Sequence, residues 1–350
     1  MELAGSANLD FLRSVAVMLV LAQHLCRRLH IEHIAWIPTT SLGLFGVLLF
    51  FVHTSLVLMR SMDRSNLMGW TLFRNFYVRR VFRIYPLSIA TVLTALALHL
   101  DSDINGTAGL SFGILPGRTA ILAHLLLVQN LAQVHSIVNV LWSLPLEVEM
   151  YVVLPFLFVW IRHKRAFWPL LALWFASVMV AVLQPSLPML GRLSVLRFVP
   201  NFLCGVIAFA LPRASRFKAS LWPLFILGLV VAFTLSPTQA TGWVLCLILA
   251  VMIPAFGDIA TSWIRVASKS IATYSYGIYL SHQFSIWICF GLMAAQPLWL
   301  RIAVLVTLLI ALPIPLYHCI EKPMIQAGAR LVARRNLRIA GNPEPTTVAA

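Results

Sequence analysis

The chain has 350 residues, of which 60% are apolar and only 11% are charged. Together with a mean hydropathy of +0.89, this composition excludes an ordinary soluble domain and predicts a polytopic membrane protein. The formal net charge of +15 does not indicate a nucleic-acid partner, because the basic residues lie between apolar segments instead of along one amphipathic face. The five cysteines stand singly without metal-ligand spacing, so we expect no metal site.

Ten segments are apolar enough to be interpreted as membrane-spanning helices. They cover residues 9–27, 41–59, 84–100, 140–161, 167–183, 194–211, 221–236, 241–256, 270–292 and 298–319. One further run, 119–131, is short for a crossing and contains His124, Gln129 and Asn130, so we expect it to be re-entrant or interfacial. The predicted fold is an all-α polytopic membrane protein with about ten spans and this one short additional helix.

The basic residues predict which side of the membrane each loop occupies. In the ten-span arrangement, nineteen of the 26 Lys and Arg residues fall on one side and six on the other, with Arg13 near the richer face. Because positive charge accumulates in cytoplasmic loops, both termini are predicted to be cytoplasmic. Residues 1–326 then form a single membrane-embedded domain, followed by a basic cytoplasmic tail, 327–350, whose last dozen residues are expected to be disordered.

The first span, within NLDFLRSVAVMLVLAQHLCRRL, carries two ionisable residues on one stripe. Arg13 and His24 are eleven positions apart, so their side chains share a helical face and lie about 16 Å apart along the axis. Ionisable groups at membrane depth are costly and indicate a functional site by default. The alternative is an Arg13 that reaches the interface and a His24 that is a hydrogen-bonded core residue.

A dense group of arginines precedes the third span, in the stretch FRNFYVRRVFRIYPL. Arg80 and Arg83 share a helical face, and Arg79 lies beside them. Guanidiniums present planar forks of donors that match phosphoryl oxygens, so these arginines are candidate phosphate ligands. Ordinary anchoring to anionic lipid is the alternative.

The fourth span, LWSLPLEVEMYVVLP, holds two carboxylates at membrane depth. Glu147 and Tyr151 are at i and i+4 and share a face, whereas Glu149 points elsewhere and needs a partner of its own. The cost of such carboxylates favours a functional role, and the alternative is an ion pair that locks helices together.

The ninth span, SIATYSYGIYLSHQFSIWICF, carries a polar stripe that includes Tyr279 and His282. The stripe is typical of a cavity lining, although tyrosines also occur in interfacial aromatic belts. One more histidine at membrane depth, His53 in the second span, has no role that the pattern assigns.

Depth estimates arrange these candidates on two levels. Counting about 1.5 Å per residue from the span ends places His24, His282 and Glu147 at a similar depth in the outer half of the membrane. The arginine candidates and Glu321 fall at the cytoplasmic rim. The levels are separated by about the reach of an extended phosphopantetheine arm, which suggests that the chain holds coenzyme A at the inner level and delivers its acyl group to the outer one.

Five of these elements together resemble the integral-membrane acyltransferase family 3, whose members O-acetylate O-antigen, exopolysaccharide, nodulation factors and similar glycans. The matching stretches, in chain order, are LDFLRSVAVMLVLAQH, RRVFRIYP with its Arg-x-x-Arg element, WSLPLEVEMYVVLP with its Trp-Ser-Leu-x-x-Glu element, YSYGIYLSHQ and HCIEKPMI. The resemblance runs from about residue 8 to 326 and maps family positions onto Arg13, His24, Arg80, Arg83, Glu147, Tyr279, His282 and Glu321.

The second span departs from the family pattern. Where the family usually carries Phe-Phe-x-x-Ser-Gly-Phe, this chain reads FFVHTSL, with His53 and Thr54 in place of the small pair. The larger side chains are expected to reshape the acceptor pocket, so the acceptor is not assigned by analogy with the family. A C-terminal esterase-like domain, present in some relatives, is not found in the chain, so we expect transfer to be completed by the membrane domain or handed to a separate envelope partner.

The resemblance implies an acyl-CoA-dependent O-acyltransferase of the bacterial inner membrane, with acetyl-CoA as the expected donor. The expected acceptor is a hydroxyl of an extracytoplasmic or lipid-linked glycan, such as a lipopolysaccharide or another polysaccharide. His24 is expected to act as a general base or as a transient acyl acceptor. The other expected site residues are Glu147, Tyr279 and His282 near the chemistry, Arg13, Arg79, Arg80 and Arg83 around the donor, and Tyr151 and Glu321 in support. A secondary transporter, for which inverted repeats are expected, and a non-catalytic scaffold of an envelope glycan complex are the alternatives.

Overall fold

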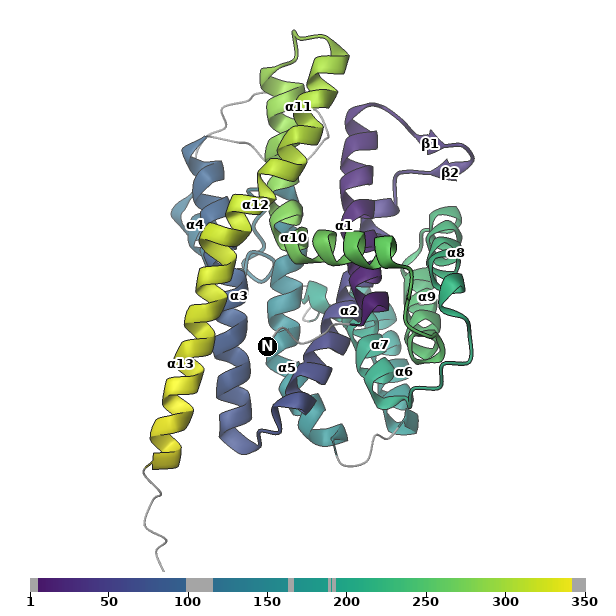
Figure 1. Ribbon diagram of the computed structural model, residues 1–350, viewed down its shortest axis with the longest axis vertical. Coiled ribbons are helices and arrows are strands. Elements are labelled where there is room, and N and C mark those ends of the chain that lie inside the picture. The colour runs from purple at the N-terminus through teal and green to yellow at the C-terminus, as the bar shows by residue number, and fades with distance from the viewer. Residues whose placement is uncertain (1–5, 99–115, 163–166, 188–189, 191–192, 342–350) are drawn as a thin grey trace, which may run out of the picture.

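The computed structural model describes residues 6–98, 116–162, 167–187, 190 and 193–341, with side chains to Asn336. The chain is almost entirely helical (Figure 1). Its α-helices are α1 Ala7–Arg28, α2 Leu42–Ser65, α3 Gly69–Ala97, α4 Arg118–Leu125, α5 Ser143–Ile161, α6 Phe167–Leu183, α7 Val199–Ala210, α8 Trp222–Leu235, α9 Gln239–Met252, α10 Ser262–Trp287, α11 Leu298–Ala311, α12 Pro313–Pro315 and α13 Lys322–Gly341. A two-stranded antiparallel hairpin, β1 His33–Ile34 and β2 Ile37–Pro38, joins α1 to α2.

The helices have the length and composition of a multi-pass membrane protein, which confirms the predicted class. Within the described residues, six helical segments are long and apolar enough to cross a membrane: Ala7–Arg28, Leu42–Ser65, Gly69–Ala97, Asn139–Ile161, Phe167–Ser186 and Leu298–Asn336. Three shorter apolar segments accompany them, Val199–Ala210, Ala219–Leu235 and Gln239–Ala255. Large apolar side chains stand on the outer surface, among them Trp168, Leu224 and Ile310, where lipid contacts suit them.

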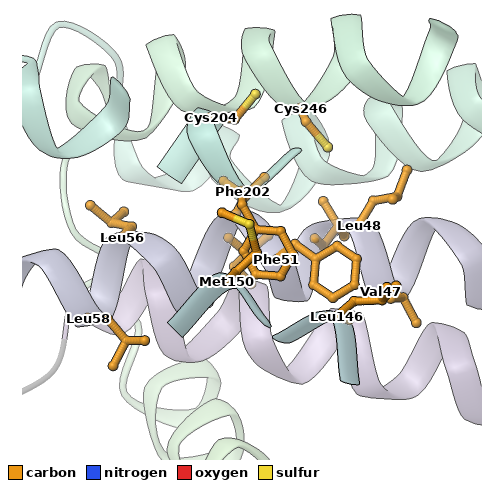
Figure 2. Close-up of a cluster of buried hydrophobic side chains, with 14 of the residues drawn as sticks. Val47, Leu48, Phe51, Leu56, Leu58, Leu146, Met150, Phe202, Cys204 and Cys246 are labelled. Atoms are coloured by element: carbon orange, nitrogen blue, oxygen red, sulfur yellow. The ribbon is translucent and has the colours of Figure 1, made fainter. Parts of the chain in front are cut away.

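Helix α2 lies at the centre of the bundle, packed against α1, α5 and α7 (Figure 1). Small residues bring the backbones together, because a Cβ added at Gly46 would lie only 2.5 Å from the Ala16 carbonyl oxygen of α1. Figure 2 shows the apolar cluster that fixes α2 against α5, α7 and α9. In it the rings of Phe51 and Phe202 stack with centroids 4.2 Å apart. This packing makes α2 a rigid wall for the polar interior beside it.

The third helix differs from the predicted span 84–100, because α3 already begins at Gly69. Its first half lies beside α5, where the Tyr77 hydroxyl donates to the Val152 carbonyl oxygen at 3.1 Å and the Phe73 and Phe156 rings are 4.8 Å apart. The arginine-rich stretch is therefore an internal part of a long helix and not a loop that enters one. Its polar side chains are accommodated because one face of α3 borders a polar interior.

The C-terminal part of the chain is helical to Gly341 and continues as α13. This helix packs along α3, where a Cβ at Gly328 would lie 2.8 Å from Phe82 and the Arg74 guanidinium donates to the Asn336 side-chain oxygen at 3.0 Å. Most of the predicted tail, 327–350, is thus an ordered helix. Residues 342–350, which include most of the segment expected to be disordered, lie outside the described residues.

Candidate functional site

A cavity of about 100 Å³, lined by charged, polar and apolar side chains, lies between α1, α2, α3, α5 and α10. We call it the central chamber. Its lining combines the charged residues Arg13, Arg80, Arg83 and Glu147, the polar residues His53, Thr54, Ser143, Tyr151, Ser275, Tyr276 and Tyr279, and the apolar residues Val47, Phe50, Phe51, Val57, Leu58, Ile84 and Leu144. Residues from five helices that are distant in sequence therefore meet at one place. The cavity has room for a phosphate-sized or acyl-sized group, since about 10–15 Å³ of this volume already holds one water molecule.

The three chamber arginines are held by different partners. The Arg13 guanidinium donates through Nε to the Ser275 hydroxyl at 2.6 Å. Arg83 forms an ion pair with Glu321, with 2.9 Å between Nη1 and Oε2, and the Glu321 side chain is completely buried. Arg80 interacts with Tyr151. Glu321 thus neutralises one of the three cations.

The two carboxylates of α5 separate as the helical spacing predicts. The Tyr151 hydroxyl donates to Glu147 at 2.5 Å, and both side chains line the central chamber. Glu149 points away and accepts a hydrogen bond from Asn130, which also lies 3.3 Å from the Ser194 hydroxyl. Glu147 is therefore the α5 carboxylate that faces the chamber. Glu149 instead connects α5 to Asn130 and, through Asn130, to Ser194.

The chamber carries more positive than negative charge. Three guanidiniums face it or border it, against the carboxylates Glu147 and Glu321. An uncompensated cation inside a membrane protein is expensive, so a bound anion would stabilise the arrangement. Arginine is the side chain best suited to hold a phosphate group there. The electrostatics of the chamber thus favour an anionic ligand.

A second group of polar residues is formed by the histidines of α1 and α10. The His24 and His282 rings have centroids 5.1 Å apart, and the Gln283 amide nitrogen lies 3.1 Å from His24 Nδ1. His282 Nδ1 lies 3.2 Å from the Ile278 carbonyl oxygen, which can accept its proton. His282 Nε2 is buried and has no hydrogen-bond partner among the described residues. This imidazole therefore presents a free nitrogen inside the protein, and we call the two rings the histidine pair.

Tyr279 lies between the chamber and the histidine pair. Its ring centroid is 6.2 Å from that of His282, while its hydroxyl donates to the Val140 carbonyl oxygen at 2.8 Å and lies 2.7 Å from the Ser143 hydroxyl. Because its hydroxyl is bonded to the segment that begins α5, Tyr279 is held in a fixed position between the two groups.

The arginine and histidine candidates do lie on two levels, but Glu147 belongs to the lower one. Along α1, His24 is eleven residues beyond Arg13, about 16 Å of helix. The depth estimate that separated Glu147 from the arginines is wrong, because Arg80, Arg83 and Glu147 line one cavity between α3 and α5. The error came from starting the third span at residue 84.

Arg79 does not line the central chamber. Its side chain is exposed and borders a second, smaller cavity of about 30 Å³, which shares Leu58 and Arg80 with the chamber. This cavity lies toward the ends of α2 and α3 that face each other across Asn66–Met68. Arg79 therefore borders this neighbouring cavity and does not line the chamber.

Sequence reasoning missed two residues that the structure adds to the site. Gln283 contacts His24, although it stands inside the quoted stretch YSYGIYLSHQ, and its position after His282 was the available signal. Ser275 holds Arg13, and no spacing rule links residues 262 positions apart. Among the described residues, no group of three His, Cys, Asp or Glu side chains could hold a metal ion.

The fold and the site together define a polytopic helical membrane protein with a buried cationic chamber beside a histidine pair. A family model described as an acyltransferase domain matches residues 6–318. The chain therefore belongs to acyltransferase family 3, as the resemblance predicted, and is a membrane acyltransferase. No match was found among curated proteins or among solved structures.

Proposed function

We propose that the chain is an acyl-CoA-dependent O-acyltransferase, with acetyl-CoA as its donor, acting on a hydroxyl of an extracytoplasmic or lipid-linked glycan. We place it in a bacterial inner membrane with about ten spans and both termini in the cytoplasm. The observation that carries the proposal is the excess of guanidiniums in the central chamber next to a histidine pair that has a free nitrogen. The chamber suits an anionic donor, and the pair suits proton transfer.

In the proposed mechanism the central chamber binds the donor and the histidine pair carries out the proton transfer. Arg13 and Arg80 bind the charged part of the donor, while Glu321 holds Arg83 in place beside them. His24 removes the proton of the acceptor hydroxyl as the hydroxyl oxygen bonds to the thioester carbonyl carbon. The carbon–sulfur bond then breaks, and the leaving thiolate takes the proton from the imidazolium, so that ester and free coenzyme A are the products.

A covalent variant of this route uses His24 as a transient acyl acceptor. The two routes differ in a direct observable. Incubation of the purified protein with labelled acetyl-CoA and no acceptor leaves label that is absent from His24→Ala only if an acyl-histidine forms at His24.

The test is replacement of the proposed base. His24→Ala is expected to abolish transfer of labelled acetyl groups from acetyl-CoA to a glycan extract, while the folded protein is still recovered. His33→Ala, which removes an exposed histidine of β1, is the matched control and should keep wild-type activity. Persistent labelled product from His24→Ala would show that the assignment is wrong. Uptake of a solute without covalent product would instead support a transporter.

The acceptor requires a separate experiment. Mass spectrometry of surface glycans from a deletion strain and its complemented strain should show an acetyl group on a sugar only in the complemented strain. Identical glycans would contradict a glycan acceptor while leaving acyl transfer itself open to the assay above.

A further inference from the structure

The α2 wall of the central chamber is apolar except at two neighbouring positions. Val47, Phe50, Phe51, Val57 and Leu58 supply its apolar part. His53 and Thr54 stand among them, and His53 is the only ionisable residue that α2 contributes to the described lining. The charged residues of the chamber all come from the other walls.

His53 differs from the other ionisable residues of the chamber in having no protein partner. It is 5% exposed, yet it makes no hydrogen bond to any residue that the structure describes. By contrast Arg83 is paired with Glu321, Arg13 with Ser275 and Glu147 with Tyr151. A buried imidazole without a partner is costly, because its nitrogens lose their bonds to water. The open side of His53 is the cavity itself.

We infer that His53 is a donor-binding residue, which hydrogen-bonds the part of the acyl donor that enters the central chamber. A neutral imidazole offers one N–H donor and one acceptor nitrogen, so it can donate to a phosphoryl or carbonyl oxygen that the arginines bring into the chamber. The inference rests on the proposed function, because it takes the acyl donor as the occupant.

The donor fits this position better than the acceptor does. The chamber presents guanidiniums to its occupant, and coenzyme A carries phosphates, whereas a neutral sugar hydroxyl offers them no charge. The proposed proton transfer to the acceptor occurs at His24, about 16 Å of helix beyond Arg13. His53 lines the same cavity as the arginines and can therefore contact the same ligand.

The test compares three variants of α2 in one binding measurement. Isothermal titration with coenzyme A, on protein purified in detergent, gives the dissociation constant. His53→Leu, which keeps the bulk and loses the hydrogen bond, should raise it about tenfold, equivalent to about 1.4 kcal/mol. His53→Gln, which keeps an N–H donor, should remain within about threefold of wild type. Ser55→Ala is the matched control, because Ser55 is buried on the same helix, bonds to the Phe51 carbonyl oxygen and does not line the chamber.

The outcomes separate the inference from the proposed function. Wild-type affinity in a folded His53→Leu protein would overturn the inference alone, and so would equal weakening by the Leu and Gln variants. If the Leu variant does not fold, His53→Ala replaces it, with the same expectation and the same contradiction. A wild-type protein that binds no coenzyme A would overturn the inference together with the proposed donor.

Discussion

Gln283 determines how His24 can use its two ring nitrogens. A side-chain amide can present oxygen or nitrogen at the same place. In the structure the amide nitrogen of Gln283 faces His24 Nδ1; an amide rotated by half a turn places its oxygen there, accepts the Nδ1 proton and leaves His24 Nε2 free to take the proton of a hydroxyl. The contact of 3.1 Å thus supplies the orienting partner that a general-base histidine needs.

Removing this partner should impair chemistry and not donor binding. Gln283→Leu is expected to lower kcat at least tenfold with an unchanged KM for acetyl-CoA, because Gln283 contacts His24 and does not line the central chamber. Initial-rate measurements provide both constants. Gln326→Leu on the exposed face of α13 is the control, and an unaltered kcat for Gln283→Leu would contradict the role assigned to it.

The Arg83–Glu321 ion pair is predicted to be a structural necessity of the chamber. Glu321→Gln leaves a guanidinium uncompensated in the interior, which costs about 3–5 kcal/mol. Asp258→Asn removes the carboxylate of an exposed pair with Arg213, whose side chains are 58% and 41% accessible, and should cost less than about 1 kcal/mol. Thermal unfolding in detergent compares the two variants. Equal melting temperatures for them would contradict the account.

At the scale of elements, the placement of α2 depends on its contact with α7. A Cβ at Gly205 would lie 2.0 Å from the Ser55 hydroxyl oxygen and 2.3 Å from the Val52 carbonyl oxygen. The two backbones therefore approach each other only because this residue is glycine. His53 and Thr54 stand on the same stretch of α2, so the α2–α7 contact also positions one wall of the chamber.

A methyl group at this contact should displace α2. Gly205→Ala is expected to lower the melting temperature and the coenzyme A affinity together. Gly228→Ala on α8, where an added Cβ meets nothing within 4 Å, should be neutral or slightly stabilising, because alanine favours the helix. A Gly205→Ala protein with wild-type stability and coenzyme A affinity would contradict this prediction.

The sequence predicted the helices where an apolar segment is uninterrupted. It predicted helix boundaries less well where charged residues lie within a helix. The arginines of α3 count against a membrane span, so the predicted span began at 84 although the helix begins at Gly69. His124 shows the same limit: the run 119–131 was expected to be re-entrant or interfacial, but its pattern did not predict that His124 is buried with both ring nitrogens bonded, to the Ala120 carbonyl oxygen and the Ile137 N–H. Tertiary contacts, which a single sequence does not contain, decide both cases.

For the whole molecule, the chain order of the motifs predicted the family, and helical spacing predicted which residues share a face. The Glu147–Tyr151 contact, the separate partner of Glu149 and the arginine and histidine levels on α1 all follow from that spacing. Helical spacing did not predict the depth of residues on one helix relative to those on another. A depth counted from the predicted end of a span contains any error in that end. Arg80 and Arg83 were placed too far from Glu147 for that reason, because α3 begins at Gly69 and not at residue 84.

The central claim is that the chain carries an acyl group from cytoplasmic coenzyme A to a hydroxyl across the two levels of its interior. The most direct measurement uses proteoliposomes with labelled acetyl-CoA and a glycan acceptor on opposite sides of the bilayer, for the wild-type protein and for His24→Ala. The account predicts labelled glycan on the side without acetyl-CoA for the wild type and none for the variant. Product from the variant, or product formed only where donor and acceptor share a side, would contradict it.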